Sequence, residues 1–162
     1  VSSPYYEHTE VGYNYRMSNV LAGIGRGQLK VLDRRVSERR NIFNYYQKAL
    51  ALDCLDWMPE PEGDCSNRWL SVVSINPDRT SITPTILIQA LAKKNIELRH
   101  VWKPMHLQPL YAKCDYYTHS GDSYCDYLLN TSVCLPSASN MSSSQQQFVV
   151  SELLEVFNNE SQ

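Results

Sequence analysis

Apolar residues recur at helical spacing across residues 19–51, and this pattern predicts one long helix. Ser18 stands directly before the first apolar turn, where its hydroxyl can cap the helix N-terminus. Three glycines fall in the first turns, and each costs about 1 kcal/mol relative to alanine. We interpret Gly23, Gly25 and Gly27 as a place where another backbone approaches closely. The apolar face of so long a helix needs a partner that a small domain does not fully supply.

The polar positions of this predicted helix carry a cluster of charges. The cluster consists of Arg34, Arg35, Glu38, Arg39 and Arg40. Most of these residues lie off the apolar stripe, which predicts a solvated or interface face. The G-x-G-x-G string of residues 23–27 does not indicate a dinucleotide site, because it follows no strand and lies inside a helical pattern.

Residues 53–162 carry shorter patterns that are typical of a small α+β domain. A turn-rich connector comes first, at residues 53–67. Three short strands are expected at residues 68–75, 96–101 and 132–135. Helices are expected at residues 84–95 with Thr83 as cap, at residues 124–129, and after a cap at residues 142–144. The predicted fold class is α/β: a long helix followed by a small α+β domain with about three short strands.

Composition excludes some classes of partner. The 15 basic and 17 acidic side chains nearly balance and are dispersed, so no one-sided field favours nucleic acid. No apolar run approaches the roughly 18 residues of a membrane span. Residues 1–15 are polar and resemble no signal peptide, so we expect a cytoplasmic protein. The chain does not begin with methionine, and we expect it to start within a longer protein.

The five cysteines are odd in number and form no C-x-x-C pair. Reduced, mostly buried thiols are the expected state. A metal site would have to combine His100, His106, Cys114 and His119. Their spacing matches no compact zinc pattern, so no metal site is predicted.

Two stretches are rich in groups suited to binding. In residues 12–18 (GYNYRMS), Asn14 and Arg16 precede a helix N-terminus, which suits a phosphate, although an ordinary capped helix explains them equally well. The second stretch is residues 99–109, where a loop held by Pro104 and Pro109 presents Trp102, Lys103 and His106 and could contact a sugar or a diphosphate. A packing loop is an equal alternative, and Lys103 is a structural or substrate-contacting lysine in preference to an activated one.

These stretches resemble the DegT/DnrJ/EryC1/StrS aminotransferases. The resemblance begins with GYNYRMS and continues through AGIG at residues 22–25, QLKVLD at residues 28–33 and Arg39-Arg40. The family commonly has alanine at the position of Gly23. The loop WKPMHLQP at residues 102–109 is most similar to members that make 4-amino sugars of the bacillosamine type. CLPS at residues 134–137, followed by a terminal helix, resembles the last strand and helix of the family.

The resemblance implies the C-terminal part of a fold-type-I, pyridoxal 5'-phosphate enzyme that forms a homodimer. Residues 1–52 would end the large-domain and dimer-interface segment, and residues 53–162 would form the small domain. Asn14 and Arg16 would reach the phosphate pocket of the partner subunit's cofactor. A substrate-binding role would fall to residues of the second stretch: Arg99, Trp102, Lys103 and His106. The Schiff-base lysine is expected upstream, so the chain alone is expected to be inactive, with no catalytic residue of its own.

For the complete enzyme, the resemblance implies transfer of an amino group from glutamate to a nucleotide-linked 4-keto-6-deoxy sugar, in amino sugar and polysaccharide biosynthesis. Two alternatives stay open. One is a non-catalytic dimerisation or regulatory module. The other is a dehydratase of the same fold with histidine in place of the lysine.

Overall fold

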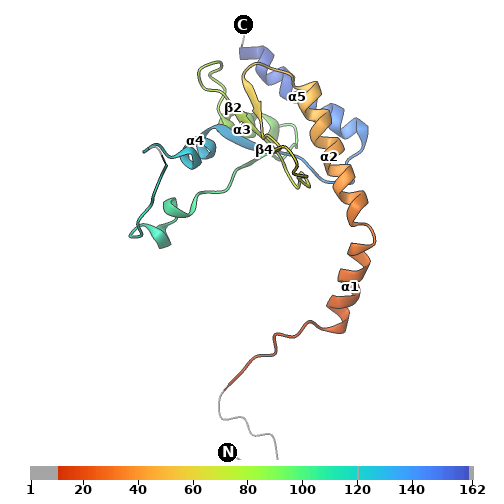
Figure 1. Cartoon of the computed structure of the whole chain (residues 1–162). Helices are drawn as coiled ribbons and strands as arrows, with labels where there is room; N and C mark the ends of the chain where they lie inside the picture. The colour runs from red at the N-terminus through yellow and green to blue at the C-terminus, as the bar shows by residue number, and fades with distance from the viewer. Residues whose placement is uncertain (1–10, 120, 161–162) are drawn as a thin grey trace, which may run out of the picture. The chain divides into compact units, whose positions relative to one another are not determined.

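The computed structural model describes residues 11–119 and 121–160, which form two compact units (Figure 1). The first unit comprises Val1–Asp33 and the second comprises Arg34–Gln162. The two units are not the two domains expected from the sequence. The boundary between a large domain and a small domain at residues 52 and 53 stays a prediction.

In the first unit, helix α1 (Asn19–Leu29) begins after Ser18, whose hydroxyl accepts a 3.3 Å hydrogen bond from the Leu21 N–H. The predicted cap is therefore confirmed. The three helical glycines have open space around them, because no described atom outside the local helix lies within 4 Å of a Cβ built at any of them. The close backbone approach that we expected is not provided by the described part of this chain.

The prediction of one helix over residues 19–51 is wrong. α1 ends at Leu29, and α2 (Leu32–Ala49) begins after residues 30 and 31. At the break, the Val31 N–H bonds to the Gln28 carbonyl at 3.1 Å, three residues back, so the four-residue pattern of an α-helix is interrupted. The apolar spacing runs on across this turn, which is why the pattern did not reveal it.

The second unit is built on a four-stranded antiparallel sheet in the order β1-β2-β4-β3. The strands are β1 (Leu55–Trp57), β2 (Ser71–Ile75), β3 (Arg99–His100) and β4 (Ser132–Leu135). The α/β class is confirmed, but the count of about three strands missed β1. β1 lies in the segment predicted as a connector, where Pro59, Pro61 and Gly63 dominate the composition.

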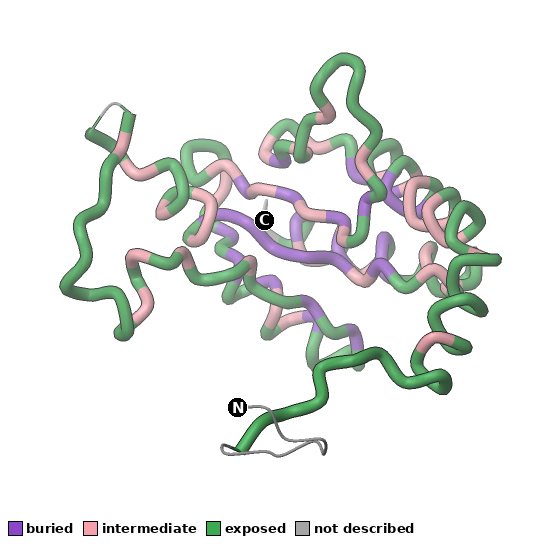
Figure 2. Tube along the Cα trace, turned by 60° about the horizontal axis from the view of Figure 1, so that its bottom comes forward, coloured by how far each residue is buried: buried purple, intermediate pink, exposed green. Residues whose placement is uncertain are grey.

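Helices α2, α3 (Pro84–Ala92) and α5 (Ser143–Glu160) supply the apolar core on one face of the sheet (Figures 1 and 2). Alternation along β2 sends Val73 and Ile75 into this core, and Val72 and Ser74 to the opposite face. Thr83 caps α3 through a 3.3 Å bond from the Ile86 N–H, as predicted. The face of the sheet opposite the helices is the one that builds the candidate site.

The arginines of α2 do not form a merely solvated face. Arg39 donates to the carbonyl oxygens of Trp69 and Ser137, the latter at 2.9 Å. Arg40 forms a 2.8 Å ion pair with Glu60. These guanidinium groups hold connecting segments against the helix, because each provides several donors in a fixed plane.

No disulfide joins the five cysteines, all of which lie within the described residues, and most of them are not buried. Cys134 is buried in β4 and Cys54 is half-buried, whereas the remaining three are exposed: Cys65, Cys114 and Cys125. The expectation of mostly buried thiols is therefore wrong, since Cys65 and Cys114 lie on loops and Cys125 lies near the start of a short helix at residues 124–131.

Candidate functional site

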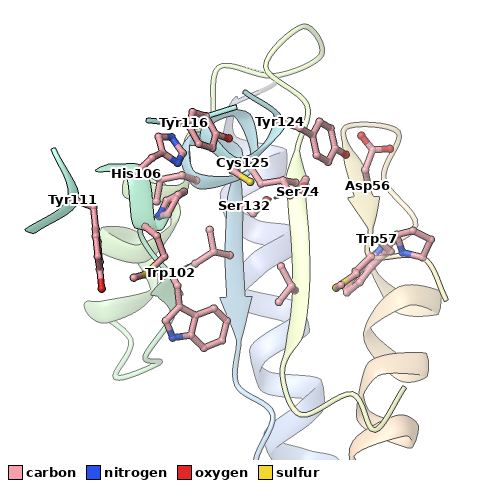
Figure 3. Close-up of a pocket in the computed structure, with 18 of the residues that line it drawn as sticks. Asp56, Trp57, Ser74, Trp102, His106, Tyr111, Tyr116, Tyr124, Cys125 and Ser132 are labelled. Atoms are coloured by element: carbon pink, nitrogen blue, oxygen red, sulfur yellow. Dashed lines mark hydrogen bonds between the residues drawn. The ribbon is translucent and has the colours of Figure 1, made fainter. Parts of the chain in front are cut away.

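A cavity of about 940 Å³ lies in the second unit, on the face of the sheet opposite the core helices (Figure 3). Asp56, Ser74 and Ser132 line it from β1, β2 and β4. The opposite wall comes from the loop after β3 and from α4 (Tyr124–Thr131). This volume lies within the roughly 300–1,000 Å³ range of small-molecule sites.

Aromatic residues line much of the cavity: Trp102, Tyr111, Tyr116, Tyr124 and Trp57, whose ring also packs edge-on against Phe43. A few polar groups interrupt them: the two serines of the strands, His106, and the carboxylates of Asp56 and Asp115. No lysine or arginine of the described chain lines this cavity. A wall of aromatic faces with a small number of polar groups is typical of sites for small organic molecules.

His106 is a polar group of the cavity with two close neighbours. Its Nε2 lies 2.7 Å from Oδ1 of Asp126, and its ring stacks on Tyr116 with centroids 3.7 Å apart and planes inclined by 10°. The Tyr116 hydroxyl in turn lies 3.1 Å from Oγ of Ser123, the residue that caps α4. Oγ of Ser123 also accepts a 3.2 Å bond from the Asp126 N–H. The four residues thus form a closed ring of contacts.

The predicted substrate residues separate into two groups. Trp102 and His106 line the cavity, and Trp102 also stacks on Trp69 with ring centroids 5.8 Å apart. Arg99 and Lys103 are exposed and do not line it. Arg99, on the edge strand β3, forms a 2.8 Å ion pair with Glu97, which precedes the strand. Within the described chain, no group of three potential metal ligands comes together.

Asn14 and Arg16 lie in the first unit, ahead of the N-terminus of α1, and both are exposed. The Arg16 N–H donates a 2.9 Å bond to Oδ1 of Asn14, which fixes a turn just before the Ser18 cap. That bond uses the amide oxygen, while the amide NH₂ is not part of it. An NH₂ donor and a guanidinium near a helix N-terminus fit the phosphate group of pyridoxal phosphate.

Sequence reasoning missed Asp126, Tyr116 and Trp57 as members of the site. The S-x-x-D spacing of Ser123 and Asp126 carries a signal for a helix start, and the hydroxyl of Ser123 does cap α4. It carries no signal that the carboxylate would turn toward His106, because the two residues are 20 positions apart. Only the fold of the segment between them brings the pair together.

The helices and the four-stranded sheet match the C-terminal part of the fold-type-I sugar aminotransferases. The aminotransferase TlmJ from Streptoalloteichus hindustanus superposes with a TM-score of 0.77 over 94% of this chain and 40% of that one, at 24% identity. That likeness shows the fold. Residues 2–154 also match the profile of the DegT/DnrJ/EryC1/StrS aminotransferase family, so the chain belongs to this family.

The chain is also similar in sequence to two longer proteins. The chain is 44% identical over 155 residues to "Putative pyridoxal phosphate-dependent aminotransferase EpsN" of Bacillus subtilis, covering 94% of this chain and 39% of that protein. It is 34% identical over 108 residues to GDP-perosamine synthase of Escherichia coli O157:H7, covering 67% and 29%. The chain therefore spans well under half the length of these relatives.

None of the helices described for this chain combines the length and the apolar character that a membrane crossing requires.

Proposed function

We propose that the complete protein containing this chain is a pyridoxal-phosphate-dependent aminotransferase that acts on a nucleotide-linked 4-keto-6-deoxy sugar, with glutamate as amino donor. The observation that carries this proposal is the family match over residues 2–154 together with the cavity that the loop of residues 102–109 helps to line. The name of the GDP-perosamine synthase, a relative at 34% identity, supports a nucleotide-linked amino sugar as product. Assignment to the bacillosamine-type branch rests on the WKPMHLQP loop.

The proposed enzyme is a homodimer in which Asn14 and Arg16 of one subunit bind the phosphate of the cofactor held by the other. Asn14 contributes its NH₂ group as a donor, and Arg16 contributes its charge. When bound, the cofactor supplies an electron sink and carries the amino group between donor and acceptor. The cofactor-bearing lysine belongs, in this proposal, to the part of the protein outside this chain, so the chain alone is inactive.

In the small domain, Trp102 and His106 bind the sugar substrate. Both line the cavity, whose aromatic wall excludes water from one side of a bound ring. Arg99, which pairs with Glu97, and Lys103 are exposed outside the cavity wall, where their charges act on the nucleotide or its phosphates at long range. The amino sugar product would serve polysaccharide biosynthesis.

The test supplies the complete protein with pyridoxal phosphate, glutamate and several nucleotide-linked keto-sugars, and identifies products by mass spectrometry. Conversion of a 4-keto group to an amine supports the proposal. Loss of a hydroxyl group without amination indicates the dehydratase alternative. Cofactor binding with no turnover of any keto-sugar indicates a regulatory or dimerisation role.

A further inference from the structure

The contacts of His106 restrict which of its ring atoms can meet a ligand. Its Nε2 lies 2.7 Å from the carboxylate of Asp126, and one face of its ring lies against Tyr116. The side chain is 14% exposed and lines the cavity. With one nitrogen bonded to a carboxylate, Nδ1 is the remaining polar atom of the ring.

Asp126 is itself held in place by the start of α4. Its backbone N–H donates to the capping hydroxyl of Ser123, and it lies in the first turn, where a negative charge is favoured by the helix dipole. The carboxylate accepts a hydrogen bond and does not donate one when ionised, so the proton of a neutral His106 belongs on Nε2. This leaves Nδ1 with a free lone pair, which is an acceptor.

The charge of the cavity wall indicates which part of a nucleotide sugar can lie near Nδ1 of His106. Among the described residues, the wall includes the carboxylates of Asp56 and Asp115 and neither lysine nor arginine. Such a wall disfavours a diphosphate and is compatible with the hydroxyl groups of a sugar.

We propose that Asp126 is a positioning residue that holds His106 with its proton on Nε2, so that Nδ1 accepts a hydrogen bond from a hydroxyl group of the substrate's sugar. This inference rests on the proposed function for the identity of the ligand, and on the geometry of this chain alone for the role of Asp126. It assigns the cavity to the sugar portion of the substrate and not to its diphosphate.

The first test reads the state of His106 directly, by ¹⁵N NMR of the complete protein labelled with [¹⁵N]histidine. His106→Gln identifies the resonances, which are recorded at a pH where the ring is neutral. The wild-type protein is expected to show two widely separated shifts, with the proton on Nε2. In Asp126→Ala and in the isosteric Asp126→Asn the two shifts should converge as both tautomers become populated. Unchanged shifts in both variants would overturn the positioning role.

The second test separates the sugar from the diphosphate by calorimetric titration of the complete protein. Asp126→Ala and His106→Gln are expected to weaken binding of the nucleotide sugar about tenfold and binding of the nucleoside diphosphate less than about twofold. The matched control is Asp122→Ala, an exposed aspartate just before the α4 cap, which should bind both ligands as the wild type does. Equal weakening for both ligands would overturn the assignment to the sugar.

The two tests also separate this inference from the proposed function. A wild-type protein that binds no nucleotide sugar overturns the proposed function and the sugar contact with it, while the NMR shifts still decide the role of Asp126. Near-UV circular dichroism of each variant shows that its fold is retained.

Discussion

The guanidinium group of Arg40 donates two hydrogen bonds to the carboxylate of Glu60, at 2.8 and 3.1 Å. Glu60 also accepts from the backbone N–H of Ser66, and Arg68 lies 3.6 Å from its other oxygen. The guanidinium of Arg68 in turn lies 3.9 Å above the ring of Phe43. These contacts fasten the segment between β1 and β2 to helix α2.

Stability should depend on pH through Glu60. The hydrogen bond from Arg40, aided by the Ser66 N–H and the charge of Arg68, lowers the pKa of Glu60 from 4.5 to about 2. Because the folded pKa is the lower one, the stabilisation is complete above about pH 4.5 and is lost as the pH falls toward 2. Urea unfolding of the 162-residue chain across this range should show less pH dependence in Glu60→Gln than in the wild type.

The control for this experiment is Glu62→Gln, an exposed glutamate two residues away. It should keep the wild-type dependence on pH. Identical pH dependence in the wild type and Glu60→Gln would show that the ion pair does not act on stability.

The apolar core between the sheet and α5 should respond to loss of one side chain. Leu153 is 1% exposed, so Leu153→Ala is expected to lower the free energy of unfolding by about 2–5 kcal/mol. Leu110 is 81% exposed, and Leu110→Ala should change it by less than about 0.5 kcal/mol. Denaturant unfolding of the chain measures both, and similar values for the two variants would contradict the placement of the core.

Cofactor retention in the complete protein should depend on the segment before α1. Asn14→Ala and Arg16→Ala each remove a donor suited to the cofactor phosphate, and each is expected to weaken binding of pyridoxal phosphate about tenfold. Titration of the apoprotein, followed by the absorbance of the bound cofactor, measures the change. Arg34→Ala, at a surface ion pair with Glu38, serves as the matched control and should bind normally. Unaltered affinity in both test variants would remove these residues from the cofactor site.

The chain alone should not hold the cofactor covalently. After mixing with one equivalent of pyridoxal phosphate and reduction with borohydride, the 162-residue chain is expected to carry no adduct at a single defined lysine. The complete protein, treated in the same way, should gain one. Mass spectrometry of the digested proteins locates any adduct, and a stoichiometric adduct on a lysine of this chain would overturn the expectation.

Local signals in the sequence predicted local structure well. Ser18 and Thr83 mark helix starts because the cap and its N–H partner are three residues apart, and the structure has both bonds. The sequence did not reveal β1, because Leu55–Trp57 is too short to show a period and becomes a strand only by pairing with β2. The helix break at residues 30 and 31 was hidden in the same way, since its apolar spacing is continuous.

Only part of the candidate site could be predicted from the sequence. The resemblance pointed to the loop of residues 102–109, and Trp102 and His106 of that loop do line the cavity. The partners of His106 could not be predicted, because Tyr116 and Asp126 reach it through folding of the intervening chain and not through spacing. Residues that act through another side chain carry little signal of their own in a single sequence.

Transfer of the amino group from glutamate to the sugar can be followed with an isotope label. The complete protein is incubated with pyridoxal phosphate, a UDP-linked or GDP-linked 4-keto-6-deoxy sugar and glutamate labelled with ¹⁵N at its amino group. Mass spectrometry of the sugar product then shows whether the label has moved. The expected product is an amino sugar that carries the ¹⁵N label, formed together with 2-oxoglutarate. A protein that binds the cofactor but leaves every keto-sugar unlabelled would contradict this expectation.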